Sequence, residues 1–376
     1  MTQVEATTAD ARQDVEEPAA ATLAVRAYDA VGAAEVAAGA DPHAAVRDAF
    51  VRQHAHGSFF HLTGWGEVIA RVHGHERRDL LAWRGSELVG VLPLMLCRGL
   101  RGRNLYSMPY AVYGGPIGVD DEVERALVHE AGELGRRERV GRVELRYLRD
   151  TGDDLPVSDL YWTFLKDLPD DPEGVLKGMP KKARAEARKA RKRHGLELIE
   201  GEWYVDDLAR LFLQNKHTLG SPALPPEHFH VLLEDLPRDE VFVHLVRRDR
   251  EPMAAVMSFA FEGTLIAYYA GTKPGADRSC SASNFMYMAL QEWAVERGFK
   301  RFDFCRSRGD SGAFQFKKHQ GFEPTPLHYR YLLVRDSGLP TFTPSNPKTR
   351  ILRAGWSKTP LWLAQRLSRR LARYLP

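Results

Sequence analysis

The sequence predicts a mixed α/β fold of two similar halves, and the main observation behind this prediction is a repeated order of elements. In residues 79–148 and again in residues 241–305, a hairpin is followed by a strand, a helix and a further strand. The two halves share negligible sequence identity, so the repeat is one of architecture. The length of 376 residues allows two domains of about 150–200 residues each. We therefore expect two tandem mixed sheets flanked by helices, each with a right-handed strand–helix–strand step.

The composition is that of an ordinary globular protein. Hydrophobic residues make up 44% of the chain and charged residues 27%, and no run of about 18 apolar residues occurs. Three cysteines without a disulfide framework or metal-ligand spacing suit a reducing compartment. The N-terminus shows no secretory signal, so the expected location is the cytoplasm.

In the first half, the elements follow from apolar spacing and turn residues. Residues 1–22 are rich in Ala, Thr and acidic residues without aromatics, and are expected to be disordered. The predicted elements are, in order, a strand over Leu23–Tyr28, helices over residues 41–53 and 60–69, a hairpin around Gly85–Ser86, a strand and glycine-rich loop over residues 104–119, a helix over residues 120–139 and a strand over residues 142–148. His61 and Trp65 suit either a pocket or the core, and their aromatic spacing favours the core.

The second half contains the stretch around which the candidate site is built. Apolar residues at helical spacing predict a helix over residues 281–298. A short strand around Asp303 follows, and a glycine-bearing turn leads to a short helix that carries Lys317. The strand brings Asp303 and Arg306 to a sheet end beside the lysine, and sheet ends are where polar groups converge on ligands.

The net charge of +3 conceals two basic stretches on an acidic body. Residues 177–193 hold nine Lys or Arg against one Glu, and residues 339–376 hold eight with no acidic residue. Each stretch therefore carries a charge of +8, which leaves −13 on the remainder. Such patches indicate phosphate, nucleic acid or anionic lipid as partners, and solvated helix faces are the alternative.

The first basic stretch predicts a helix with two distinct faces. Alanines at positions 183, 187 and 190 form a stripe that can lie against the body, while Lys181, Arg184 and Arg188 share a neighbouring face. Like charges at this spacing cost about 0.3 kcal/mol per pair, and an anion would offset that repulsion. Arginine forks suit a diphosphate or an RNA backbone.

The second basic stretch lies in the C-terminal tail, residues 336–376, an amphipathic segment in which Trp356, Trp362 and several leucines alternate with arginines. This pattern is typical of a helix that lies on an anionic membrane face. Docking of the apolar stripe onto the protein itself stays open as an alternative. The tail therefore allows peripheral contact with the inner face of the membrane.

The available chemistry favours acyl transfer over metal or nucleotide-loop chemistry. The histidines show no metal-ligand spacing, and G-x-S-x-G, Walker and G-x-G-x-x-G motifs are absent. The remaining candidates are Arg184, Arg188, Lys317, Tyr113, Tyr268 and Asn284, with Asp303 as the nearby acid. An amine or hydroxyl would attack a thioester or ester while Lys317 stabilises the oxyanion, and Asp303 would hold the lysine or accept a proton.

Three motifs carry a resemblance to a known family. They are K-K-A-R-A-E-A-R-K-A-R-K-R-H-G, N-F-M-Y-M-A-L-Q-E-W-A followed by F-D-F, and F-K-K-x-x-G-F-E-P-x-P-L-H-Y-R-Y. Over about residues 58–331 the chain resembles the FemAB-like acyltransferases, which are double-domain relatives of the GCN5-type N-acetyltransferases (GNAT). It looks closest to the FemAB-related branch of exosortase and exopolysaccharide gene clusters, with a BioF2-like acetyltransferase domain.

The resemblance implies GNAT-like domains over residues 23–168 and 169–335, followed by the tail. It also implies acyl or aminoacyl transfer to an amine, with acyl-CoA or aminoacyl-tRNA as cosubstrate and no tightly bound cofactor. The implied acceptor is a small molecule or a lipid-linked glycan; tRNA is a candidate partner, and DNA is not expected.

The same resemblance assigns roles to single residues. Arg184 matches the family's phosphate-contacting arginine, with Arg188 one turn on. Phe316 and Lys317 match the F-K-x-x-x-G motif at the transfer site, and Tyr113 matches the loop before G-P in the first domain.

Two departures from the family bear on the donor. The coiled-coil arm of peptidoglycan-bridge members is absent, and the interval G-T-K-P-G-A-D-R-S-C-S-A-S does not match the GNAT diphosphate motif. The leading expectation is an acyltransferase that modifies an amine of a cell-envelope or exopolysaccharide precursor. The alternatives are a peptidoglycan-type aminoacyl-tRNA transferase and a non-catalytic module that binds RNA or an anionic membrane.

Overall fold

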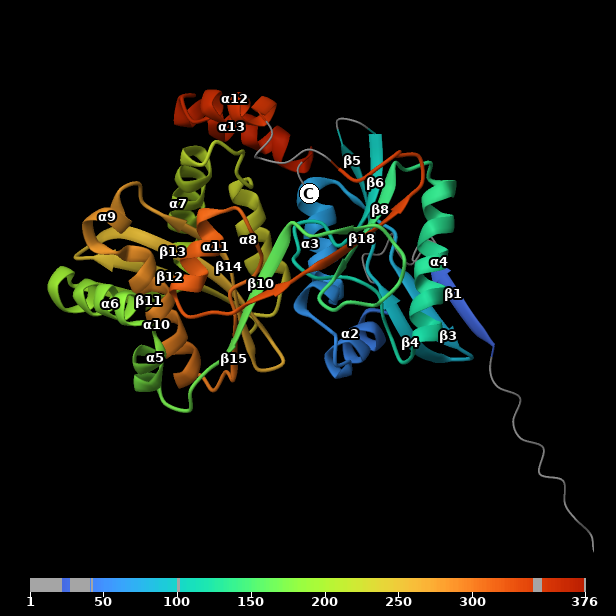
Figure 1. Cartoon of the computed structure of the whole chain (residues 1–376), viewed down its shortest axis with the longest axis horizontal. Coiled ribbons are helices and arrows are strands. Elements are labelled where there is room, and N and C mark those ends of the chain that lie inside the picture. The colour runs from blue at the N-terminus through green and yellow to red at the C-terminus, as the bar shows by residue number, and fades with distance from the viewer. Residues whose placement is uncertain (1–21, 28–40, 42, 100–101, 341–346, 375–376) are drawn as a thin grey trace, which may run out of the picture.

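The computed structural model describes residues 22–27, 41, 43–99, 102–340 and 347–374, and it contains two halves that each combine sheets and helices (Figure 1). The predicted mixed α/β class is confirmed. The disorder expected at the N-terminus concerns residues 1–21, which lie outside the described residues.

The first half is built on two sheets. A four-stranded sheet has the order β1 (Leu23–Ala27), β3 (Leu80–Arg84), β4 (Glu87–Leu92) and β7 (Ile117–Gly118). A six-stranded sheet has the order β2 (Glu76–Arg77), β5 (Met95–Gly99), β6 (Gly102–Ser107), β8 (Arg142–Tyr147), β18 (His328–Leu333) and β9 (Val157–Ser158). The helical segments are α2 (Ala44–Gln53), η2 (Phe59–His61), α3 (Thr63–His73) and α4 (Asp121–Arg137). Helix α4 begins where the Asp120 carboxylate accepts the Val123 N–H.

The second half is organised by one large sheet. Its order is β11 (Leu196–Glu200), β12 (Val241–Arg248), β13 (Glu251–Phe261), β14 (Thr264–Thr272), β15 (Arg301–Asp303), β10 (Tyr161–Asp167) and β16 (Ser307–Arg308), with β17 (Pro324–Pro326) paired to β10. The helical segments are α5 (Pro172–Gly178), α6 (Lys181–His194), η3 (Glu202–Tyr204), α7 (Val205–Thr218), α8 (Pro226–Asp235), α9 (Ala276–Cys280), α10 (Ala282–Glu296) and α11 (Gly312–His319). The predicted hairpin, third strand, helix and final strand are confirmed. Pairs β6–β8 and β14–β15 are parallel, as the predicted crossover steps require.

The two halves exchange strands across the boundary predicted at Leu168. Strand β10 precedes that position but pairs with β15 of the second half, and β18 follows the second half but pairs with β8 of the first. The chain thus crosses between the sheets twice. Neither sheet is complete without a strand from the other part of the chain.

An aromatic core joins the halves. The rings of Phe59 and Phe259 stack with centroids 4.7 Å apart, and Trp65 meets Phe259 edge-on at 5.6 Å. Trp65 is fully buried, so the preference for a core role at this position is confirmed. Buried residues of both halves therefore belong to one continuous hydrophobic core.

The C-terminal tail forms helices α12 (Pro347–Trp356) and α13 (Leu361–Leu371) and the short η4 (Ala372–Tyr374), which lie at the top of the molecule in Figure 1. Among the described residues, no helix combines the length and apolarity that a bilayer crossing demands.

A buried histidine cluster lies beneath η4. His73 Nε2 is 3.1 Å from His228 Nδ1, and His228 Nε2 is 2.9 Å from the Tyr269 hydroxyl. His75 Nε2 is 3.2 Å from the Tyr110 hydroxyl, which donates to the carbonyl of Ala372. Burial lowers the pKa of His73 to about 2, that of His75 to about 4 and that of His228 to about 3.

We expect the free energy of unfolding to fall between about pH 7.5 and pH 5.5, because the three histidines stay neutral when folded but protonate near pH 6.5 when unfolded. The unfolded state then binds more protons, and each histidine costs about 1.4 kcal/mol per pH unit below its unfolded pKa. Urea unfolding at both pH values measures the loss. The variant His75→Asn should show a shallower dependence, and equal stability of the wild type at both pH values would contradict the prediction.

Candidate active site between the two halves

Asp303 lies where two neighbouring strands separate. Pairing of β14 with β15 covers only Thr264–Ile266 against Arg301–Asp303, whereas β14 continues to Thr272. Asp303 also lines a cavity of about 140 Å³ between the halves. The same cavity is lined by residues of the first half, among them His61, Tyr113, Gly114, Gly115 and Arg146. A carboxylate at the end of a strand, facing a cavity, is well placed to meet a ligand.

The Asp303 carboxylate is buried and hydrogen-bonded on both oxygens. Oδ1 accepts the Cys305 N–H at 2.7 Å, and Oδ2 accepts the Tyr113 hydroxyl at 3.0 Å. Burial raises the pKa of Asp303 to about 6, although these hydrogen bonds act in the opposite direction. Near neutral pH the group is therefore mostly ionised and able to accept a proton.

Cys305 makes the turn that joins Asp303 to Lys317. Its φ of +58° lies in the left-handed region, which is costly for a residue with a side chain. In this conformation its N–H reaches Asp303, and its carbonyl accepts the Lys317 ammonium at 2.9 Å. One strained residue thus positions both predicted catalytic groups.

Lys317 is buried at the end of α11. Its Nζ lies 5.3 Å from the Phe164 ring centroid and 5.0 Å from that of Phe304, and it also donates to the Arg306 carbonyl at 3.2 Å. Burial lowers its pKa to about 8. No hydrogen bond joins it to Asp303 within the described part of the chain, so Asp303 acts on the lysine through charge alone.

In the first half, His61 supports the loop that carries Tyr113. Its Nε2 is 2.8 Å from the Gly115 carbonyl and its Nδ1 is 2.7 Å from the Ser58 hydroxyl. Since a carbonyl only accepts, Nε2 carries the proton and Nδ1 accepts from Ser58. Burial lowers the pKa of His61 to about 4, so this neutral tautomer persists at neutral pH.

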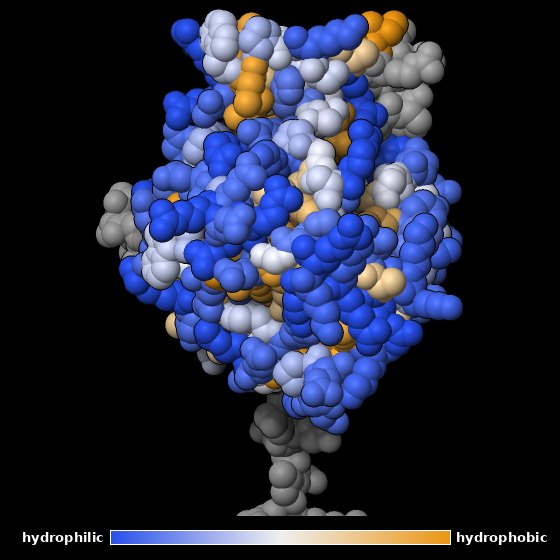
Figure 2. Space-filling view, turned by 90° about the vertical axis from the view of Figure 1, so that its left-hand side faces the viewer, coloured by the Kyte–Doolittle hydropathy of each residue, from blue (hydrophilic) through white to orange (hydrophobic). Residues whose placement is uncertain are grey.

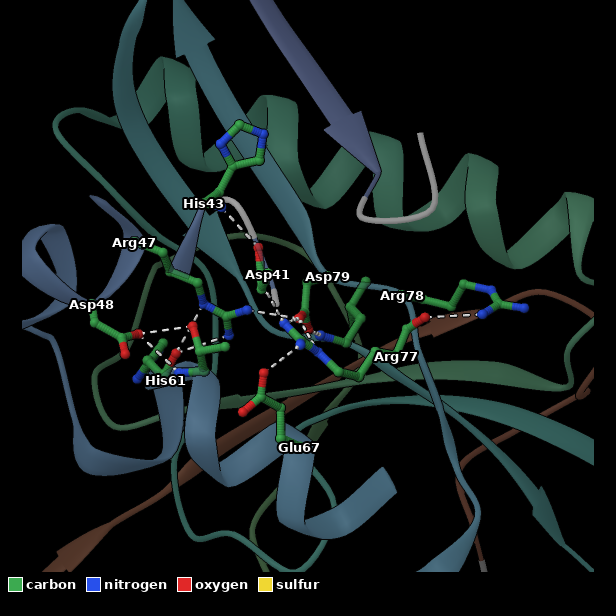
Figure 3. Close-up of polar contacts among 11 residues, drawn as sticks. Asp41, His43, Arg47, Asp48, His61, Glu67, Arg77, Arg78 and Asp79 are labelled. Carbon is green, nitrogen blue, oxygen red and sulfur yellow. Dashed lines mark hydrogen bonds and ion pairs between the residues drawn. The ribbon is translucent and has the colours of Figure 1, made fainter. Parts of the chain in front are cut away.

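A buried ion network holds His61 in turn. Arg47 donates to the His61 carbonyl at 2.8 and 3.2 Å and to Asp79 at 2.6 Å. Arg77 reaches the same Asp79 oxygen at 2.7 Å and bonds Asp41 at 2.9 Å, as Figure 3 shows. The network fixes the entry to α3, and through His61 it fixes the cavity wall.

Arg306 and Tyr268 lie at the junction of the halves. The Arg306 guanidinium lies 4.9 Å from the Tyr161 ring and 5.7 Å from the Tyr329 ring, and it donates to the Tyr329 hydroxyl at 3.0 Å. These tyrosines come from the exchanged strands β10 and β18. The Tyr268 hydroxyl donates to the Tyr110 carbonyl. Both predicted residues therefore hold the interface, and Arg306 lies directly behind Lys317.

Phe316 and Asn284 lie on the other side of α11. The Phe316 ring is 5.9 Å from Tyr287 and 6.2 Å from Phe304. The side-chain oxygen of Asn284 accepts from Gln320 at 2.6 Å. These two residues hold α11 against α10, and neither lines the cavity that Asp303 faces.

The basic helix α6 packs by its alanine stripe, as predicted. Its three stripe alanines are buried, and α6 lies against α10. Lys181 and Arg188 are exposed and Arg184 is half-buried, with a hydrogen bond to the Lys177 carbonyl at 3.1 Å. Figure 2 looks onto this side of the molecule, which is mostly hydrophilic. The cationic face is thus free to meet solvent or an anion.

The start of α6 adjoins the end of α11. A Cβ at Gly321, whose φ is +84°, would lie 2.9 Å from Pro180 Cδ, so glycine permits this close approach. Gly321 follows the Lys317 helix and Pro180 precedes α6. The F-K-x-x-x-G motif therefore ends against the beginning of the basic helix.

The N-terminus of α10 already binds a carboxylate. Asp277 accepts the Ser283 N–H at 2.7 Å and the Ser283 hydroxyl at 2.9 Å. A helix N-terminus attracts anions, so a diphosphate at this place would compete with Asp277. This geometry agrees with the mismatch of the local sequence to the GNAT diphosphate motif.

Sequence reasoning missed part of the site. Thr163 contacts the Tyr113 hydroxyl, and Cys305 supplies the connecting turn. For His61 the sequence favours the core over a pocket, and the structure shows both, since the residue is buried and also lines the cavity. No group of His, Cys, Asp and Glu side chains suited to a metal ion occurs in the described residues.

Comparisons with known proteins agree with this architecture. Residues 178–318 match the family model described as "Acetyltransferase (GNAT) domain". No curated protein matches the sequence.

Among solved structures, FemX is 15% identical with a TM-score of 0.59, over 77% of this chain and 96% of FemX. A tandem GNAT protein from the clavulanic acid biosynthesis pathway is 13% identical with a TM-score of 0.50, over 84% and 100% of the two chains. L-PGS from Bacillus licheniformis is 15% identical with a TM-score of 0.50, over 85% and 98%. At these identities the likeness concerns the fold, and it confirms two tandem GNAT-like domains.

Proposed function

We propose that the chain is a FemAB-like acyltransferase, because residues 178–318 match the family model of a GNAT acetyltransferase domain and the fold resembles FemX and a tandem GNAT protein. Its proposed acceptor is an amine of a cell-envelope or exopolysaccharide precursor. The observation that carries the proposal is the buried Asp303 carboxylate, which faces the cavity between the halves, beside Tyr113 and one turn of chain from Lys317.

In the proposed reaction the amine nitrogen attacks the acyl carbon of a thioester or ester. The new C–N bond forms while the C–S or C–O bond breaks, and Asp303 takes the proton that the amine loses. The leaving thiolate or alkoxide takes up a proton as it departs. Lys317 does not line the cavity itself, and its ammonium is held by the Cys305 and Arg306 carbonyls. In this proposal it stabilises the negative charge on the acyl oxygen through its own charge, since a preorganised cation in a buried site costs no reorganisation during the reaction.

The donor proposed is an aminoacyl-tRNA in preference to an acyl-CoA. Asp277 occupies the α10 N-terminus, where a diphosphate would bind, while α6 offers an exposed cationic face next to the end of α11. One further structural neighbour is the C-terminal domain of a putative lysylphosphatidylglycerol synthetase from Agrobacterium fabrum, a name that also describes an aminoacylated product. A row of arginines and lysines suits the repeated phosphates of an RNA backbone, whereas a diphosphate needs a single phosphate pocket.

A thermal-shift screen against acyl-CoAs, aminoacyl-tRNA and UDP-sugars tests the donor. A ligand at about 100 times its Kd adds about 2.7 kcal/mol to the free energy of unfolding, which gives a clear melting shift. We expect the shift with aminoacyl-tRNA, and we expect Arg184→Ala to lose most of it. Arg136→Ala, an exposed arginine on α4, is the matched control and should keep the shift.

Transfer is then measured with the donor that binds. Lys317→Ala should retain binding and lose transfer. Full activity of both Lys317→Ala and Arg184→Ala would overturn the proposal. RNA binding that weakens steeply with salt, without transfer to any acceptor, would instead support the non-catalytic module.

A further inference from the structure

The C-terminal tail is attached to the second half by specific polar contacts. Arg353 donates to the Leu219 carbonyl at 2.9 and 3.1 Å, at the C-terminal end of α7 where carbonyls lack helical partners. His217 Nε2 lies 2.8 Å from the Thr359 carbonyl, and the Ala223 N–H donates to the Ser368 hydroxyl at 3.1 Å. The tail therefore has a defined face toward the protein and a defined face away from it.

The large apolar side chains of the tail are divided between these two faces, since Leu363, Leu367 and Leu371 are half-buried while others are exposed. The buried positions of the tail are small: Ala364, Ser368 and Ala372. The large apolar side chains Ile351 and Trp362 point away from the protein and are 74% and 66% exposed. Leu352 and Leu361 are exposed as well. A helix that served only to cover the body would turn its large apolar residues inward.

The same outer surface is strongly cationic. Residues 339–376 contain eight Lys or Arg and no acidic residue. Of these, Lys358, Arg366 and Arg370 are exposed. Figure 2 shows the result as hydrophobic side chains among hydrophilic ones at the top of the molecule. Exposed tryptophan and aliphatic side chains ringed by cations suit the boundary between lipid headgroups and acyl chains.

We propose that the outer face of α12 and α13, defined by Ile351, Leu352 and Trp362 with the surrounding cations, docks on an anionic phospholipid bilayer. Trp362 and the aliphatic side chains enter the interface, and the cations pair with headgroup phosphates. Charge complementarity favours this occupant over a symmetric dimer, because a second copy that docked through the same face would bring a surface of the same positive sign. The inference is independent of the transfer chemistry.

Vesicle co-sedimentation of the full chain tests the proposal. We expect binding to vesicles that contain one-third phosphatidylglycerol in phosphatidylcholine, and weak binding to pure phosphatidylcholine. The double variant Ile351→Ser/Trp362→Ser removes two exposed side chains without touching the buried face, and it should bind about tenfold more weakly. High salt should reduce wild-type binding, because screening weakens the attraction between the cations and the headgroups.

Trp203→Ser is the matched control. Trp203 is 71% exposed, but it lies next to Glu202 before the N-terminal end of α7, opposite to the end where Arg353 docks. This variant should bind vesicles like the wild type. Equal binding by wild type and double variant, or no binding to anionic vesicles, would overturn the proposal. A dimer in solution that the double variant abolishes would do so too, since it would identify a second copy as the occupant.

Discussion

Asp303→Asn should lower the rate of acyl transfer by about 10²–10⁴-fold while the protein stays folded. The asparagine amide has the size of the carboxyl group, and its oxygen can still accept from Tyr113 or from the Cys305 N–H. What it cannot do is take the proton that the amine must lose. The measurement is single-turnover transfer with saturating donor, compared between wild type and variant after both give the same melting temperature.

The pH profile separates proton transfer from a structural role. The wild-type rate should rise with pH through the pKa of Asp303, about 6, because only the ionised carboxylate accepts a proton. Tyr113→Phe removes a hydrogen bond that favours the carboxylate, so the rise should move to higher pH with most of the maximal rate kept. A wild-type rate in Asp303→Asn, or a rise that stays in place in Tyr113→Phe, would contradict the assignment.

The neighbourhood of Asp303 and Lys317 could be predicted because it is local in the chain. A short strand, a turn and a short helix confine both groups to one sheet end, and their apolar patterns were visible in the sequence. The connecting turn was not, since a cysteine gives no sign of a left-handed conformation. The link from Asp303 to Lys317 through the backbone N–H and carbonyl of Cys305 is therefore visible only in the structure.

The contact of Tyr113 with Asp303 joins segments about half the chain apart, and no pattern in the sequence announces it. It depends on the two exchanged strands. Strand β10 comes from the first part of the chain but pairs with β15 of the second half, and β18 follows the second half but pairs with β8 of the first. A strand's apolar alternation shows that it has a buried face but does not identify its neighbour. For the same reason Thr163 and Tyr329, which lie on these strands, had no signal that linked them to the site.

The tail shows a different limit. Its sequence predicts an amphipathic helix that docks either on the protein or on a membrane. Both predictions assume that all the apolar residues form one surface. In the fold the small residues are buried and Leu363, Leu367 and Leu371 are half-buried, whereas Ile351, Leu352 and Trp362 are exposed. Docking on the protein thus uses part of the apolar surface, and the exposed part remains available to a second partner.

Asp79→Asn should cost about 3–5 kcal/mol of unfolding free energy, the largest stability loss we expect from one substitution, because it breaks a buried ion network from one side. Asp79 Oδ2 accepts from Arg47 at 2.6 Å and from Arg77 at 2.7 Å, and Oδ1 accepts the Leu94 N–H at 2.9 Å. Burial disfavours the Asp79 charge, yet the two arginines hold its pKa below the usual value. Loss of the carboxylate leaves both guanidinium groups buried without their shared counter-ion.

Glu67→Gln is the matched control for this prediction. Glu67 lies in the same network, 3.5 Å from Arg77, but its side chain is 46% exposed. An exposed pair of this kind is worth about 0.2–1 kcal/mol, so this variant should unfold close to the wild type in urea. If Asp79→Asn cost no more than Glu67→Gln, the ion network would not be what anchors His61. The cavity wall opposite Asp303 would then owe its position to the aromatic core around Trp65 instead.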